Sequence, residues 1–139
     1  RIFMGDVGSQ FCGFVLAMLG VVAGRFDGVE LSLLLVPMLL SGVLFDVAFT
    51  LARRALAGER LTAPHRGHLY QVAQRAGVPA VAVALVHWGF AAFGGVCCLV
   101  FIAAPPAWKP YVPLLTLGPQ LAWLWFVRGR ARTAAIGRW

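Results

Sequence analysis

The feature that most constrains this chain is a series of long apolar stretches separated by arginine-rich segments. Only 12% of the 139 residues are charged and 60% are hydrophobic, whereas a soluble domain carries about 25% charged residues. This charge is too sparse to cover a water-facing surface, and the chain is too apolar to be disordered. The sequence therefore excludes a soluble globular enzyme and predicts an all-α, polytopic integral membrane protein.

Four apolar stretches are predicted as transmembrane helices, because crossing the hydrocarbon core takes about 20 mostly apolar residues. They cover residues 7–24, 31–52, 78–104 and 111–127. Pro37 predicts a kink in the second stretch, since proline lacks the N–H that a helix interior needs. A basic loop, residues 53–77, follows the second stretch, and within it residues 66–76 are predicted to form a short surface helix.

Positive charge is concentrated in the 53–77 loop and in the tail after residue 127. By the positive-inside rule, both segments and the N-terminal edge lie on the cytoplasmic side of a lipid bilayer. Anionic lipid headgroups explain the net charge of +7 better than nucleic acid does, because no nucleic-acid-binding motif accompanies the arginines. The three cysteines lie inside apolar runs and do not form a disulfide framework.

Asp6 stands at the start of the first stretch, between Gly5 and Gly8. A carboxylate there caps free N–H groups and meets the positive end of the helix dipole, so a purely structural role is one reading. The functional reading is that the glycines allow a ligand to approach closely. A carboxylate at the membrane edge also suits Mg²⁺, which binds one or two carboxylates together with phosphate oxygens.

Histidines and arginines in the 53–77 loop form a second group of candidates. Arginine presents a fork that matches phosphate, and histidine donates hydrogen bonds near neutral pH. The residues concerned are His65, His68, Arg53, Arg54 and Arg66. The alternative is a positively charged loop that serves only membrane topology.

Asp46 lies inside the second predicted span, where an ionisable residue is costly and is by default a functional candidate. The alternative reading is a carboxylate that pairs with Arg53 or Arg54 at the interface. His87 is predicted to be satisfied within the bundle, and the adjacent Cys97 and Cys98 to pack as small apolar side chains.

Two of these groups resemble a known family. Residues 3–9, FMGDVGS, resemble the F-M-G-D-x-G-S motif of the polyprenyl-phosphate N-acetylhexosamine-1-phosphate transferase superfamily. Asp46, the Arg53–Arg54 pair and residues 65–71, HRGHLYQ, are similar to that family's D…RR…H-L-H-H cytoplasmic loop. The loop ends in Tyr-Gln where many members have histidines, and this form looks more like the branch that primes O-antigen and related surface polysaccharides.

The resemblance implies a multi-pass enzyme of the bacterial inner membrane with a cytoplasmic active face. Such an enzyme transfers a sugar 1-phosphate from a UDP-N-acetylhexosamine to undecaprenyl phosphate and releases UMP. The catalytic residues it implies are Asp6, which would coordinate Mg²⁺, and His68, which would contact the phosphates of the nucleotide sugar. The substrate-binding residues it implies are His65, Arg66, Arg53, Arg54 and Asp46.

The family's paired aspartates and its N-x-x-D motif lie upstream of the FMGD motif. Because the sequence starts at Arg1, just before that motif, we expect the 139 residues to be the C-terminal portion of a longer enzyme and to be inert alone. A homodimer is left open. The competing hypothesis is a small non-enzymatic membrane protein, such as a transporter or assembly subunit, with Asp46 and His87 as relay groups.

Overall fold

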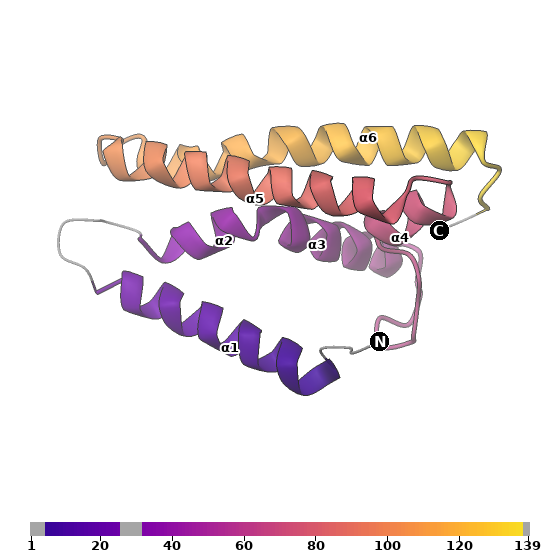
Figure 1. The fold of residues 1–139 in the computed structure, drawn as a ribbon, viewed down its shortest axis with the longest axis horizontal. Coiled ribbons are helices and arrows are strands. Elements are labelled where there is room, and N and C mark those ends of the chain that lie inside the picture. The colour runs from indigo at the N-terminus through magenta and orange to yellow at the C-terminus, as the bar shows by residue number, and fades with distance from the viewer. Residues whose placement is uncertain (1–4, 26–31, 138–139) are drawn as a thin grey trace.

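The computed structural model describes residues 5–25 and 32–137, and every regular element in them is helical (Figure 1). In chain order these elements are α1 (Gly5–Ala23), the 3-10 helix η1 (Ser32–Leu34), α2 (Leu35–Leu39), α3 (Ser41–Leu56), α4 (Leu69–Arg75), α5 (Ala80–Ala103), the 3-10 helix η2 (Lys109–Thr116) and α6 (Leu117–Thr133). The all-α prediction is therefore confirmed for this part of the chain.

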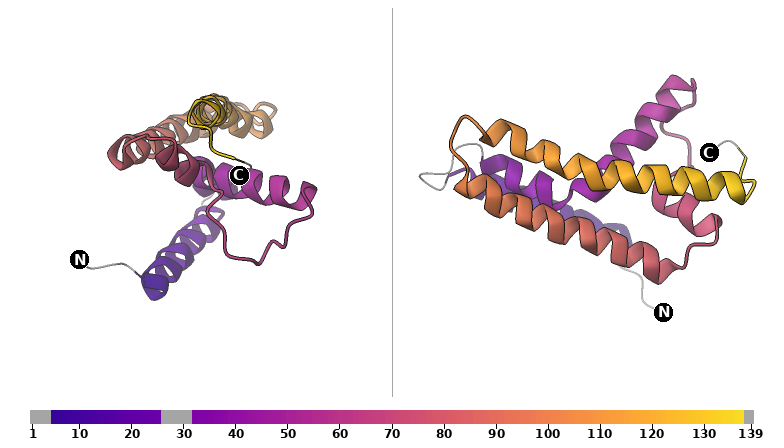
Figure 2. Two further views of the ribbon diagram at one scale, coloured as in Figure 1. Left: turned by 90° about the vertical axis from the view of Figure 1, so that its right-hand side faces the viewer. Right: turned by 90° about the horizontal axis from the view of Figure 1, so that it is seen from above.

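The long helices run back and forth along one axis of the molecule. The end of α3, helix α4 and the end of α6 consequently lie at one end, on the right in Figure 1, and the start of α1 points in the same direction but stands apart from them. The connection between α5 and η2 lies at the opposite end, as both Figure 1 and the view from above in Figure 2 show. We call the first of these the α4 end. It gathers the segments that carry the predicted functional residues.

One helix in the described part of the chain, α5, is long and apolar enough to cross a membrane, and Val7–Val22 within α1 forms a shorter apolar helix. The predicted second span, residues 31–52, is divided into η1, α2 and α3. Pro37 lies in the first turn of α2, where its missing N–H costs no hydrogen bond. Pro37 therefore lies near the start of a helix and does not kink a longer one. The helix is interrupted at Leu40, between α2 and α3.

The predicted fourth span, residues 111–127, also differs from the observed helix. Pro110 and Pro113 lie in η2, a 3-10 segment, and the α-helix begins only at Leu117. It continues to Thr133, so Arg128, Arg130 and Arg132, which the sequence assigned to a tail, lie in the last turns of α6. Cations are favourable there because they complement the negative end of the helix dipole.

Two apolar clusters hold the helices together. The one at the α4 end joins α4 to α5 and α6, through Leu69, Val72, Ala73, Val83, Phe90, Trp123, Val127 and Ala131. The other joins α2 to α5 and η2, through Met38, Cys97, Cys98, Phe101 and Val112. The surface helix predicted over 66–76 is therefore a helix over 69–75 with a fully buried apolar side, because Leu69 and Val72 complete the core.

Candidate functional site

Asp46 joins α3 to the start of α4. Its side chain is 4% exposed, and its Oδ1 accepts hydrogen bonds from the backbone N–H of Leu69 at 2.8 Å and from the Thr50 hydroxyl at 3.1 Å. Its Oδ2 accepts from the backbone N–H of Tyr70 at 3.3 Å. The first N–H groups of a helix have no partner within the helix, so this carboxylate satisfies two of them from a different helix.

His68 lies beside the same carboxylate. Its Nδ1 is 3.3 Å from Asp46 Oδ1, and its backbone N–H donates to Gln71 Oε1 at 3.4 Å. The rings of His65 and Tyr70 flank that of His68, with centroids 4.8 Å and 5.9 Å away. His68 thus precedes the first turn of α4, and the side chain of Gln71, the third residue of that helix, accepts from its backbone N–H.

A cavity of about 390 Å³ opens beside this arrangement. Its lining residues come from α3, α4 and α5, and are Val43, Asp46, Val47, His68, Tyr70 and His87. His87 also bonds to the Val83 carbonyl oxygen through Nδ1 at 2.9 Å, as predicted for a histidine satisfied within the bundle. We call this cavity the histidine pocket.

Arg54 holds the loop that follows α3. Its side chain is buried, and its Nε donates to Glu59 Oε2 at 2.9 Å. Its two terminal nitrogens donate to the backbone carbonyl oxygens of Arg60, Leu61 and Ala63. Because most of its N–H groups are used in this way, Arg54 shapes the loop that carries the histidines.

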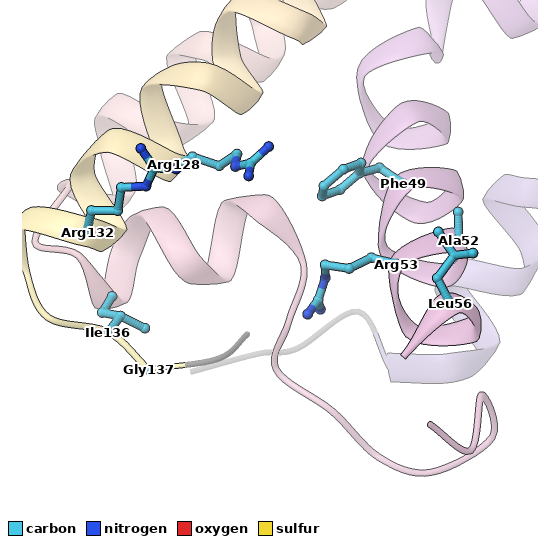
Figure 3. A pocket seen from close by; sticks show the side chains of 8 residues that line it. All are labelled: Phe49, Ala52, Arg53, Leu56, Arg128, Arg132, Ile136 and Gly137. Carbon is cyan, nitrogen blue, oxygen red and sulfur yellow. The ribbon is translucent and has the colours of Figure 1, made fainter. Parts of the chain in front are cut away.

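Arg53 also contacts this loop, at Gly67. A Cβ added at Gly67 would lie 2.7 Å from Arg53 Nη2, so the guanidinium packs closely against the backbone between His65 and His68. Arg53 also lines a larger pocket between α3 and α6 (Figure 3). Arg66, the remaining predicted arginine, is exposed on the loop.

Charge and partial burial set the protonation of this loop. Desolvation lowers the pKa of His65 below its usual 6.5, and electrostatic interactions with Arg54, His68 and Arg53 lower it further, against a smaller opposite effect of Glu59. The hydrogen bond from Arg54 lowers the pKa of Glu59. At neutral pH the loop therefore combines a neutral His65 and an ionised Glu59 with its arginines.

The predicted metal ligand, Asp6, lies in the first turn of α1, and its side chain is outside the described part of the structure. Among the described side chains, no three His, Cys, Asp or Glu residues come together as a metal site. The carboxylates of Asp46 and Glu59 are used by hydrogen bonds to α4, His68 and Arg54. The described residues alone do not fit Mg²⁺, and the expectation of a Mg²⁺ site rests on the sequence around Asp6.

One sequence interpretation is corrected by this geometry. The carboxylate of Asp46 does not pair with Arg53 or Arg54, because the folded chain brings the N–H groups of α4 to it. Thr50, which contacts the same carboxylate, was missed, although its spacing of four residues on one helix face is a usable signal.

Over 71 residues the chain is 35% identical to the probable undecaprenyl-phosphate N-acetylglucosaminyl 1-phosphate transferase of Bacillus subtilis (strain 168). The aligned part is 50% of this chain and 20% of that protein, so the chain covers about a fifth of the relative's length. No protein-family model and no solved structure matches the chain. The similarity confirms the resemblance to the polyprenyl-phosphate N-acetylhexosamine-1-phosphate transferase superfamily that the motifs of the sequence indicate.

Proposed function

We propose that this chain takes part in the transfer of a sugar 1-phosphate from a UDP-N-acetylhexosamine to undecaprenyl phosphate, with release of UMP. The similarity to a probable transferase of that kind supports the reaction class. The structural observation that carries the proposal is the contact between Asp46 and His68 at the histidine pocket, beside a loop shaped by arginines.

In this proposal His68 contacts the diphosphate of the nucleotide sugar and Asp46 positions it. The contact between Asp46 and Nδ1 fixes the orientation of the imidazole ring and leaves Nε2 for a phosphate oxygen. Arg53 and Arg66 supply positive charge nearby, while Arg54 acts through the loop that it holds. Phosphoryl transfer depends mainly on positioning and on charge neutralisation, and these residues supply both.

Asp6 is proposed as the Mg²⁺ ligand, on the strength of the FMGDVGS resemblance. Helix α1 contacts α2 and η1, and its start points toward the α4 end but stands apart from α3 and α4 (Figure 1). A bound Mg²⁺ would neutralise charge on the diphosphate.

We further propose that the protein crosses the bacterial inner membrane several times with the α4 end in the cytoplasm. The arginines at the ends of α3 and α6 support this orientation. The interrupted backbone between α2 and α3 is satisfied locally, because the N–H of Leu40 donates to the Val36 carbonyl oxygen and the N–H groups of Val43 and Leu44 donate to that of Leu40.

The test is UMP release by the full-length protein in detergent, with UDP-N-acetylglucosamine, undecaprenyl phosphate and Mg²⁺. We expect Asp6→Asn and His68→Gln each to lower the rate by about 100-fold, the usual cost of removing one group that stabilises transition-state charge. Arg75→Gln, at an exposed arginine at the end of α4, is the control and keeps the rate. Near-normal turnover in both site variants, or no UMP release from any UDP-sugar, would refute the proposal and favour a non-enzymatic membrane protein.

A further inference from the structure

Gln120 and Ser41 form a buried polar pair that joins α6 to the first residue of α3. Gln120 is 2% exposed and Ser41 is 9% exposed, and Gln120 Nε2 donates a hydrogen bond to Ser41 Oγ at 2.9 Å. The other polar atom of the amide, Gln120 Oε1, is buried and accepts no hydrogen bond from the described residues. Buried polar atoms without a partner are rare, because nothing compensates the loss of their hydration. Gln120 therefore needs a further hydrogen-bond partner.

This need does not depend on which way the amide is turned. In the opposite orientation Gln120 Oε1 accepts a hydrogen bond from the Ser41 hydroxyl, and Nε2 is then the atom without a partner. The missing partner is a hydrogen-bond donor in the first orientation and an acceptor in the second. Water serves as both.

A cavity of about 320 Å³ reaches this pair, and we call it the Gln120 cavity. It lies where α2 and α3 face η2 and the start of α6, and the polar residues that line it are Ser41, Thr116 and Gln120. Thr116 Oγ1 donates to the Pro113 carbonyl oxygen at 2.7 Å and can still accept a hydrogen bond. Because a water molecule takes up about 30 Å³ in the liquid, the cavity has ample room for one. The rest of its lining is apolar and includes Met38, Leu44, Phe45 and Leu117.

We infer that the Gln120 cavity holds a bound water molecule, hydrogen-bonded to the Gln120 amide, to Ser41 and to Thr116. A buried water typically makes about three hydrogen bonds to polar groups of the protein, and these three side chains provide them. The lining residues carry no charge, so the cavity suits a neutral molecule better than an ion. A lipid chain in the same space would leave the amide unpaired, because hydrocarbon neither donates nor accepts a hydrogen bond.

The water stands at the interruption between α2 and α3. Met38 belongs to α2 and Ser41 is the first residue of α3, and both line the cavity. Ordered water is one of the means by which polar groups at a broken helix are satisfied inside a membrane. The Gln120 cavity shares no lining residue with the histidine pocket, so the inference does not rest on the proposed function.

The experiment detects the water through the oxidation of Met38. A brief X-ray pulse splits water into hydroxyl radicals, which oxidise the side chains next to it, and methionine sulfur is readily oxidised. Met38 is 2% exposed, so bulk solvent does not reach it. The full-length protein is irradiated in lipid nanodiscs, and the oxidation rate of the peptide that contains Met38 is measured by mass spectrometry. We expect Gln120→Leu to lower this rate at least about fivefold, because the water loses a main partner.

Matched controls separate the loss of water from a general change in the cavity. Leu44→Ile changes an apolar lining residue and keeps all the polar groups, so the oxidation rate of Met38 should stay the same. Thr116→Val removes one of the three partners and should lower the rate by less than Gln120→Leu does. Met18 is 45% exposed on α1, away from the lining of the cavity, and should be oxidised at one rate in every variant.

A direct measurement on the unaltered protein covers the case in which Gln120→Leu does not fold. With glutamine isotope-labelled, we expect an NMR cross-peak between the side-chain NH2 of Gln120 and a long-lived water, and no such cross-peak for Gln74, which is exposed on α4. The inference is overturned if this cross-peak is missing, if Met38 is oxidised equally fast in Gln120→Leu, or if Leu44→Ile lowers the rate as much. A missing cross-peak together with unoxidised Met38 would show that a lipid chain fills the cavity.

Discussion

Asp46 shows how one buried carboxylate can organise a site made from two helices. Its oxygens receive the N–H groups of Leu69 and Tyr70 and the Thr50 hydroxyl, and they contact the ring of His68. A buried carboxylate without such partners would be strongly destabilising. The same hydrogen bonds fix where α4 begins and which way His68 points.

The first prediction concerns this carboxylate. Asp46→Ala leaves the N–H groups of Leu69 and Tyr70 without their acceptor, and each unsatisfied buried group costs about 1–3 kcal/mol. We expect the amide hydrogens of α4 to exchange with deuterium at least about tenfold faster, measured by mass spectrometry on the peptide that contains α4. Asp46→Asn keeps one acceptor oxygen and a similar volume, and should show a smaller effect. Unchanged exchange in Asp46→Ala would show that α4 is held in place by its apolar contacts alone.

The second prediction concerns the titration of His65. Its pKa is lowered by desolvation and by Arg54, His68 and Arg53, so at mildly acidic pH the unfolded chain binds more protons at this position than the folded protein does. The free energy of unfolding therefore rises with pH in this range. The contribution of His65 is fully present above about pH 6.5 and is lost as the pH falls through the folded-state pKa.

The measurement is an NMR titration of the histidine rings in the labelled protein. We expect the midpoint of His65 to lie below 6.5, and His68→Gln to move it upward because the electrostatic effect of His68 on His65 is removed. A midpoint of His65 at or above 6.5 in the unaltered protein would contradict the prediction.

At the scale of single residues, the sequence predicts which side chains come together better than it predicts their hydrogen-bond partners. His65, His68 and Asp46 do come together at one pocket or its rim, and the motif resemblance grouped them. The partners of Asp46 are backbone N–H groups 23 and 24 residues away, and no side-chain pattern encodes such a contact. The buried hydrogen bond from Gln120 to Ser41, 79 residues apart, was missed for the same reason.

Among the helices, the closest packing is that between α2 and α5. A Cβ added at Gly94 would lie 2.3 Å from the Met38 carbonyl oxygen and 3.1 Å from Leu39 Cα. These are backbone atoms, which cannot move aside without shifting the helix. Gly94 therefore lets α5 approach α2 closely, and α2 is set apart from α3 by a helix interruption at Leu40 that the sequence did not predict.

The third prediction follows from this contact and has a control in the same helix. Gly94→Ala should lower the free energy of unfolding by about 1–3 kcal/mol, the usual cost of overpacking a core. Gly89→Ala has nothing within 4 Å of its new Cβ and should be neutral or slightly stabilising, since alanine favours helix more than glycine does. Thermal unfolding in detergent measures both variants. Equal melting temperatures for the two variants would mean that α2 is free to move away from α5.

For the whole molecule, the central result is that the chain returns repeatedly to the α4 end. The long helices in Figure 1 run alternately in opposite directions, as successive predicted spans would. The 53–77 loop and the end of α6 therefore lie at the same end. Hydropathy and charge could predict this arrangement because they act along whole segments. The helix boundaries differ, because prolines at 37, 110 and 113 determine where regular helices start.

The fourth prediction is a topology test. In a variant in which Ala replaces Cys12, Cys97 and Cys98, single cysteines are introduced by Thr62→Cys and Ala134→Cys, and by Ala107→Cys in the connection between α5 and η2. We expect the first two to react with a membrane-impermeant maleimide from the cytoplasmic side only, and Ala107→Cys from the opposite side only. Labelling of Thr62→Cys and Ala107→Cys from the same side would show that α5 does not cross the membrane.

Helix α3 carries three of these residues in order along the chain. Asp46 anchors α4, Arg53 contacts the loop and lines the pocket between α3 and α6, and Arg54 shapes the loop. At a rise of about 1.5 Å per residue, the Cα positions of Asp46 and Arg53 lie about 10 Å apart along its axis. A hydrogen-bonded helix does not stretch, so α3 fixes the spacing between the histidine pocket and the pocket between α3 and α6. Any molecule that reaches from one to the other has to match a length that is built into the backbone.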